Sequence, residues 1–291
     1  KSLHSDTSAT NYRMVRSFRT VELPRLSGGG VDTAAARIDL GVAYLRKDLA
    51  AEAAAQFERA LALDPKHALA SSGLGRAQLA LNLPLRAIDS LEAAARLDPR
   101  LAEPHVLLAR AWQQQQLPAR ALDALTTAVK LAPDDANVRV QYATLLEQQG
   151  RAGEAVEQYE MARARRPADG AVLSGLASAY ARLGRLADAV TTLEEAVGAH
   201  PDDAALLYRL GRAYLGVNQP KAAAGAFTRA VRRAPLMAQG HADLGLALLG
   251  TGDARGAVAS LERALQLDPA HAGANQLLGE INAQLQGGTP R

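Results

Sequence analysis

The chain has 291 residues, of which 48% are hydrophobic and only 4% aromatic, so alanine and leucine supply most of its apolar surface. The 63 alanines favour an all-α protein, because alanine has the highest helix propensity. The absence of cysteine excludes disulfide frameworks, thiolate zinc sites, iron–sulfur clusters and cysteine nucleophiles. No run of about 18 apolar residues occurs, so the sequence predicts no membrane-spanning segment.

The net charge of +3 is concentrated at the amino end of the chain. Residues 1–30 hold five basic and two acidic side chains, and the rest of the chain holds 28 of each. Nucleic-acid-binding domains usually carry a basic stripe on their folded part, together with aromatic side chains on which bases stack. The sequence shows neither pattern, so we expect no nucleic-acid partner.

Residues 1–30 show little helical periodicity and end in Gly28-Gly29-Gly30, which predicts an extended basic arm followed by a glycine-rich hinge. Basic and apolar residues alternate in this arm, as they do in segments that add to a sheet edge or lie across an acidic surface. The arm residues predicted to contact a partner are Arg13, Arg16, Phe18 and Arg19. A flexible tail without contacts is the alternative interpretation.

From residue 34 onward, the sequence repeats with a period of 34 residues. Seven of the 13 prolines lie at this spacing: Pro65, Pro99, Pro133, Pro167, Pro201, Pro235 and Pro269. We number the repeat so that it begins at Ala34 and has Pro65 at position 32. Positions 20 and 27 are then alanine in all seven copies, and position 8 is always glycine or alanine. Positions 7 and 24 always carry a large side chain, such as Leu40 and Phe57 in the first copy.

This size pattern predicts two helices in each repeat, helix A over positions 1–14 and helix B over positions 18–31. Helices cross closely only where side chains are small, so positions 8, 20 and 27 are the expected contact points. The proline at position 32 ends helix B, because it lacks an amide donor and restricts the residue before it. Acidic residues that follow this proline, as in Pro133-Asp134-Asp135, are expected to cap the next helix A.

The 34-residue period with these small positions and the recurring proline resembles the tetratricopeptide repeat (TPR) family. The resemblance implies an all-α, right-handed superhelical solenoid of paired antiparallel helices, with helix A lining a concave groove that binds proteins. One subclass of the family binds chaperone carboxylates through lysine at position 5 and asparagine at position 9. That clamp is missing here, so we expect no cochaperone role.

The sequence predicts four segments in chain order. The arm and hinge occupy residues 1–30, and residues 31–271 hold seven repeats. Residues 272–286 predict one further helix A without a helix B, with Leu277, Leu278, Ile281 and Leu285 on one face. A solenoid needs a polar-faced cap over its last repeat, and this helix fits that role. Residues 287–291 form a short tail.

The sequence offers no catalytic, metal or cofactor site. The six histidines are scattered, and no HExxH pair or carboxylate cluster with ligand spacing is present. The glycines of Gly73-Leu74-Gly75 fall inside a predicted helix without a preceding strand, so helix packing explains them better than a phosphate loop. We therefore expect a protein that is not an enzyme and that holds no metal or cofactor.

Under the resemblance, positions 2, 5, 6, 9, 12 and 13 of helix A line the groove, which is mixed in charge and slightly basic. Arg76 and Arg110 occupy position 9 in adjacent repeats and are expected to bind a carboxylate through charge-assisted hydrogen bonds. A second candidate group comprises Arg182, Tyr208, Arg209 and Arg212. Arginines that are merely solvated, or paired with neighbouring acids, are the alternative interpretation.

An amide-rich segment lies between these two groups in the sequence. Its side chains can donate to and accept from the backbone of an extended peptide. The predicted contacts are Gln113, Asn137 and Gln141. The alternative is that these amides are simply tolerated on an exposed helix surface.

The sequence thus favours a non-catalytic interaction scaffold that binds an extended or helical segment of a partner, with acidic segments suited to its arginines. Two alternatives remain: an assembly subunit of a larger complex, for example at an envelope or membrane, and the regulatory region of an enzyme whose catalytic part precedes Lys1. Alanine, arginine and leucine are abundant, as in GC-rich bacterial genomes. By resemblance to bacterial TPR proteins, a periplasmic or membrane-associated location is slightly favoured over a cytoplasmic one.

Overall fold

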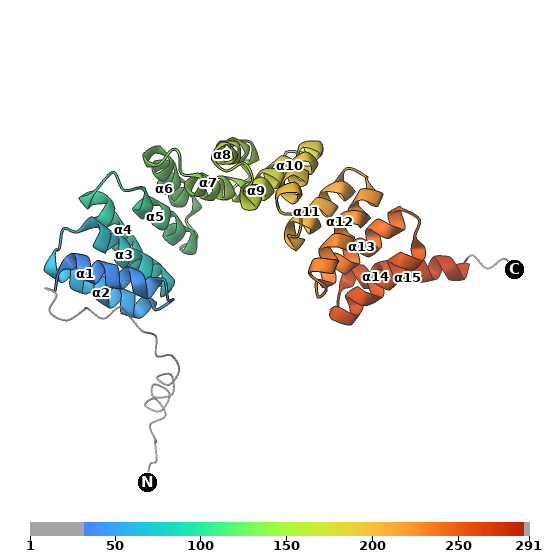
Figure 1. The fold of residues 1–291 in the computed structure, drawn as a ribbon, viewed down its shortest axis with the longest axis horizontal. Helices are drawn as coiled ribbons and strands as arrows, with labels where there is room; N and C mark the ends of the chain where they lie inside the picture. The colour runs from blue at the N-terminus through green and yellow to red at the C-terminus, as the bar shows by residue number, and fades with distance from the viewer. Residues whose placement is uncertain (1–31, 288–291) are drawn as a thin grey trace, which may run out of the picture. The chain divides into compact units, whose positions relative to one another are not determined.

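The computed structural model describes residues 32–287, and over that range it consists of fifteen α-helices without a strand (Figure 1). The all-α prediction is confirmed. The predicted arm of residues 1–30 and tail residues 288–291 lie outside the described residues. The helices are α1 (Ala34–Leu45), α2 (Ala50–Leu63), α3 (Ala68–Ala80), α4 (Pro84–Leu97), α5 (Ala102–Gln114), α6 (Pro118–Leu131), α7 (Ala136–Gln148), α8 (Ala152–Arg165), α9 (Gly170–Arg182), α10 (Leu186–Ala199), α11 (Ala204–Gly216), α12 (Pro220–Arg233), α13 (Ala238–Gly250), α14 (Ala254–Leu267) and α15 (Ala272–Gly287).

The chain divides into two compact units. The first ends at Gln115 and contains α1–α5, and the second begins at Gln116 and contains α6–α15. Odd-numbered helices are the helices A of the repeats, and even-numbered helices are the helices B. The boundary therefore falls between helix A and helix B of the third repeat.

Each helix B ends two residues before the recurring proline. The residue before the proline is the C-cap, and its backbone is extended at Asp64, Asp98 and Asp268, with φ −139° and ψ 94° at Asp64. A following proline favours this conformation. Helix B occupies positions 17–30 rather than the predicted 18–31. Three of these helices carry proline at their first position, where the missing amide donor has no cost, namely Pro84, Pro118 and Pro220.

The acidic residues before three of the helices A act as N-caps, as predicted. Asp135, Asp169 and Asp203 each accept hydrogen bonds from two backbone amides in the first turn of α7, α9 and α11, respectively. Such a cap satisfies amides that have no partner within the helix, and its loss usually costs about 1 kcal/mol.

The turn from helix A to helix B depends on one left-handed residue at position 15 of every repeat. Its φ lies between 57° and 84° at Asp48, Asn82, Gln116, Gly150, Gly184, Asn218 and Gly252. Glycine and asparagine adopt this conformation readily, whereas glutamine does so only at a cost. Gln116 is therefore the least suitable of the seven.

Large side chains at position 24 are enclosed by small residues on two neighbouring helices A. Phe57 is fully buried, and a Cβ atom would lie 2.8 Å from its ring at Gly41 and 2.4 Å at Gly73. Gly41 belongs to the same repeat and Gly73 to the next one. In the second unit, Tyr159 contacts Gly175 in the same way, at 2.4 Å from an added Cβ. The ring thus joins two repeats only because the opposing residues lack a side chain.

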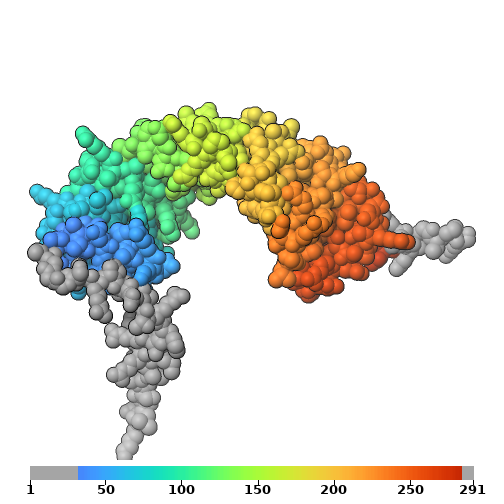
Figure 2. All heavy atoms as spheres, viewed as in Figure 1, coloured from blue at the N-terminus to red at the C-terminus, as the bar shows by residue number. Residues whose placement is uncertain are grey.

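The alanines at positions 20 and 27 have at most 2% of their surface exposed in every repeat. The predicted helix contact points are therefore confirmed. Within each unit, helices consecutive in the chain pack against each other, and the atoms of successive repeats are in direct contact (Figure 2). Successive helices A also touch one another, as α1 and α3 do in the first unit and α9 and α11 in the second. Helices A thus form a continuous layer in each unit.

The last helix, α15, covers the end of the repeats. Ala274 and Ile281 are buried against α14 and α13, while Leu277 and Leu278 are half-buried. The ring nitrogen Nδ1 of His271 accepts a hydrogen bond from the Ala274 backbone amide at 3.1 Å. This contact caps the first turn of α15, where the sequence predicted a capping helix.

We expect Gly175→Ala to lower the free energy of unfolding by about 1–3 kcal/mol, because the added methyl group overlaps the Tyr159 ring. Gly225→Ala is the matched control, since nothing lies within 4 Å of a Cβ at this position in α12. It should raise the free energy of unfolding by about 0.5–1 kcal/mol through helix propensity. Urea denaturation of both variants measures the difference, and equal effects would contradict the packing described above.

We expect Gln116→Gly to raise the free energy of unfolding by about 1 kcal/mol, because glycine adopts a φ of 57° without strain. The neighbouring Gln115 has a φ of −85°, so Gln115→Gly should instead destabilise the chain by about 0.5 kcal/mol. Thermal and urea unfolding of the two variants checks the signs. A stabilising Gln115→Gly or a destabilising Gln116→Gly would show that the turn geometry is different.

Candidate protein-binding cavity

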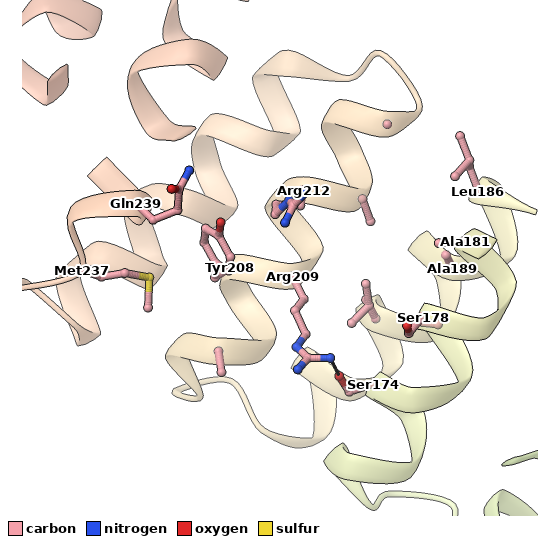
Figure 3. Close-up of a pocket in the computed structure, with 15 residues that line it drawn as sticks. Ser174, Ser178, Ala181, Leu186, Ala189, Tyr208, Arg209, Arg212, Met237 and Gln239 are labelled. Carbon is pink, nitrogen blue, oxygen red and sulfur yellow. Dashed lines mark hydrogen bonds between the residues drawn. The ribbon is translucent and has the colours of Figure 1, made fainter. Parts of the chain in front are cut away.

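The second unit contains a cavity of about 740 Å³, lined mainly by residues of α9, α10 and α11 (Figure 3). Three residues predicted from the sequence lie together in it: Tyr208, Arg209 and Arg212. Most of the other lining residues are small or apolar: Ser174, Ala177, Ser178, Ala181, Leu186, Ala189, Leu193, Ala205, Ala213, Gly216 and Met237; Gln239 completes the wall. The cavity is therefore an apolar hollow with cationic side chains.

The fifth repeat has small side chains on the face of α9 that lines the cavity. Position 12 of helix A is leucine, glutamine or glutamate in the six other repeats but Ala181 in this one. Position 9 is Ser178, the smallest residue found at that position. Ser174, Ala177, Ser178 and Ala181 share one helix face, since they are three or four residues apart. Space that longer side chains fill in other repeats remains open here.

Both arginines of the cavity belong to α11 and are exposed. The guanidinium of Arg209 reaches toward α9, where its Nη1 donates a hydrogen bond to Ser174 Oγ at 2.6 Å (Figure 3). Arg212 lies beside Tyr208. Within residues 32–287, neither arginine forms an ion pair with a carboxylate. Most of their donor capacity is thus available to an anionic ligand.

Tyr208 is held by a chain of hydrogen bonds that runs from α11 to the start of α15. Its hydroxyl donates to Asp243 Oδ2 at 2.7 Å, and Gln239 Nε2 donates to Asp243 Oδ1 at 2.9 Å. Gln239 Oε1 in turn lies 3.0 Å from His271 Nε2. Burial, followed by the contact with the Asp243 carboxylate, raises the pKa of Tyr208 to about 12, although Arg212 opposes this effect. Tyr208 is therefore a fixed, neutral part of the cavity wall.

Arg182, the fourth member of the predicted group, has a different position. Its Nε lies 3.2 Å from Glu147 Oε1, and Glu147 is buried with only 7% of its surface exposed. The same carboxylate accepts hydrogen bonds from Tyr159 Oη at 3.0 Å and Ser178 Oγ at 2.9 Å. A buried carboxylate needs such partners, so the structure gives Arg182 a role in holding α7 to α9.

Arg76 and Arg110 lie in the first unit, on α3 and α5. Arg76 forms an ion pair with Glu103, the first-turn carboxylate of α5. Partial burial lowers the pKa of Arg76. Arg110 is exposed, and its side chain has no hydrogen-bond or ion-pair partner among the described residues. The two arginines therefore differ in how freely they can receive a ligand.

The predicted amide contacts fall in different units. Gln113 is exposed near the end of α5 in the first unit, and Gln141 is exposed on α7 in the second. Asn137, also on α7, accepts a hydrogen bond from Arg166 Nη1 at 2.8 Å through its Oδ1. The predicted arm contacts Arg13, Arg16, Phe18 and Arg19 lie outside the described residues. All of these remain predictions.

Sequence reasoning missed most of the cavity wall. Gln239 comes from the start of the seventh repeat, Met237 is the last residue of the sixth, and Leu186 comes from helix B of the fifth. The available signal was the loss of side-chain volume at Ser178 and Ala181, which departs from the other repeats at positions 9 and 12. A search for departures from the repeat pattern, in addition to its agreements, would have found it.

A family model described as the tetratricopeptide repeat matches the chain in overlapping windows that together cover residues 30–102 and 106–287. The chain belongs to the tetratricopeptide repeat family. Members of this family are interaction scaffolds and subunits of complexes. No curated protein matches the chain.

Several solved structures share this TPR fold. PilW, a widely conserved type IV pilus biogenesis factor, is 19% identical over 72% of this chain and 98% of its own, with a TM-score of 0.62. The C-terminal part of a TPR protein from Cytophaga hutchinsonii is 15% identical over 82% of this chain and 98% of its own, with a TM-score of 0.67.

A third match is a chain from the Cut9-Hcn1 hetero-tetramer of the APC/C, which is 18% identical with a TM-score of 0.58. The alignment covers 86% of this chain but only 52% of the APC/C chain, so this chain spans about half its length. At these identities the matches establish the solenoid fold.

None of the helices in residues 32–287 is both long and apolar enough to cross a lipid bilayer. The described residues also contain no group of three histidine, aspartate or glutamate side chains placed to bind one metal ion.

We expect Tyr208→Phe to remove a tyrosine that ionises near pH 12, and Asp243→Asn to shift Tyr208 ionisation to lower pH. Because the folded-state pKa is raised from the ordinary value of 10.0, the contribution of this tyrosine to stability is complete below pH 10 and disappears as the pH rises through 12. Tyrosinate absorbance during a pH titration measures both effects. Ionisation of Tyr208 near the ordinary pKa of 10.0 would contradict its burial and its hydrogen bond to Asp243.

Proposed function

We propose that the chain is a non-catalytic protein–protein interaction scaffold, which binds an extended or helical segment of a partner along the exposed surface of its helices A. The observation that carries this proposal is the cavity of about 740 Å³ that opens beside α11. Its size lies within the range of about 300–1,000 Å³ that is typical of ligand pockets. Its two arginines and apolar walls match the mixed chemistry of a polypeptide.

An acidic segment of the partner suits the charges on helices A. Arg209 and Arg212 lack carboxylate partners in the second unit, and Arg110 lacks one in the first. Charge-assisted hydrogen bonds from arginine to carboxylate are roughly twice as strong as neutral ones. The exposed amide Gln141 would add contacts to the backbone of the partner. The arm of residues 1–30 would be a second contact.

An assembly subunit of a larger complex is a second candidate, favoured by exposed apolar side chains in both units. Leu85 at the start of α4 is 65% exposed, and Leu236 before α13 is 78% exposed. Exposed apolar residues of this size often belong to protein contacts when they gather in patches. PilW, described as a pilus biogenesis factor, and Cut9-Hcn1, described as an APC/C hetero-tetramer, are the kinds of protein this role would resemble.

Photo-crosslinking in a lysate of the source organism tests the scaffold proposal. The crosslinking residue p-benzoylphenylalanine replaces Ala205, an exposed residue of α11 that lines the cavity. The control carries it at Ala187, an exposed residue of α10 outside the cavity lining. We expect Ala205 to give one discrete protein adduct that is absent from the Ala187 control. No adduct at Ala205, or identical adducts at both positions, would argue against binding at this surface.

A further inference from the structure

The cavity in the second unit combines an unfilled apolar space with two cations, and each feature constrains the ligand. The space lies over Ala181, where six other repeats have leucine, glutamine or glutamate. Its walls include the buried Ala189 and Leu193, with 2% and 4% of their surfaces exposed. An apolar side chain entering this space would be removed from water without displacing a polar partner.

The charge of the lining is unbalanced. Arg209 and Arg212 are its charged members, and no carboxylate lines the cavity. Arg209 is partly oriented by Ser174, because the hydrogen bond of 2.6 Å draws the guanidinium across the gap between α11 and α9. Figure 3 shows both arginines beside the space that the small residues of α9 leave open. A carboxylate next to the apolar side chain would therefore complete the site.

A second hollow adjoins the cavity. We therefore expect the ligand to be a segment that continues past the cavity rather than one that ends in it. This hollow of about 650 Å³ shares Tyr208, Arg212, Gly216 and Gln239 with the cavity. It is also lined by Leu215, Asp243 and Leu246, and Asp243 is already bonded to Tyr208 and Gln239. Leu236, which is 78% exposed, precedes the lining residue Met237 in the sequence.

We propose that this cavity recognises an internal acidic–apolar segment of a partner protein, placing a leucine-sized or aromatic side chain over Ala181 and an adjacent aspartate or glutamate side chain on Arg209 and Arg212. The proposal rests on the scaffold function and specifies the ligand class of its site. The apolar space selects against purely acidic segments, and the two arginines select against purely apolar ones.

Peptide selection on the intact chain tests this proposal. A phage library of random peptides, flanked on both sides by fixed linkers so that no free terminus is offered, is enriched on the wild-type protein. We expect the enriched sequences to place aspartate or glutamate within two residues of a leucine, isoleucine, methionine or aromatic residue. Synthetic versions with blocked ends then provide dissociation constants by fluorescence anisotropy.

Two variants probe the two halves of the site. The double variant Arg209→Ala/Arg212→Ala and the single variant Ala181→Leu, which fills the space as other repeats do, should each weaken binding about tenfold or more. The charge-matched control is Arg232→Ala/Arg255→Ala, two exposed arginines on α12 and α14. The size-matched control is Ala171→Leu, at an exposed position of α9 outside the cavity lining. Circular dichroism verifies that all variants keep their helices.

The possible results distinguish failure of the proposed ligand class from failure of the scaffold function itself. Enriched peptides of another composition, or acidic–apolar peptides that bind the Ala181→Leu variant as well as the wild type, would refute the ligand class while leaving the scaffold function intact. Binding that requires a free carboxyl terminus would also refute the internal segment. Failure of the wild type to enrich any peptide, together with no crosslink at Ala205, would refute the scaffold function itself.

Discussion

The contact between a large side chain at position 24 and the small residues of two helices A sets the geometry of each repeat. Phe57 illustrates it, because its ring occupies the volume that a Cβ at Gly41 or Gly73 would need. The same relation holds for Tyr159 and Gly175 in the second unit. Close-packed interiors accept few changes in volume, so this pairing leaves one arrangement for successive repeats.

The candidate binding cavity lies where the fifth repeat departs from the side-chain sizes of the other repeats. Position 20 and position 27 keep their alanines in the fifth repeat, so the helices pack as elsewhere. Positions 9 and 12 of this repeat carry the small residues Ser178 and Ala181. The alanines that form the helix contacts are therefore kept in the repeat whose smaller Ala181 opens the cavity.

The arginines of helices A have two different surroundings in the structure. Arg182 neutralises Glu147, whose buried carboxylate also accepts hydrogen bonds from Tyr159 and Ser178. No carboxylate lines the cavity that Arg209 and Arg212 share, so no acidic side chain of the lining balances their charge. A charge that balances a buried partner contributes to stability, whereas one without a partner is suited to recognition.

The sequence alone determined the helix pairs and their contact points and placed the helix ends to within two residues, because these depend on local chemistry and on residue size at a fixed period. Proline at position 32 restricts the backbone of the residue before it, and Asp135 caps α7, which begins at the next residue. The sequence also grouped Tyr208, Arg209 and Arg212, but only the tertiary structure decided which residues of other repeats lie beside them. Tyr208, Arg209 and Arg212 share a cavity with Leu186 and Gln239 from neighbouring repeats, whereas Arg182 pairs with Glu147. Side chains on adjacent repeats compete for the same partners, and spacing along the chain does not encode which of them pair.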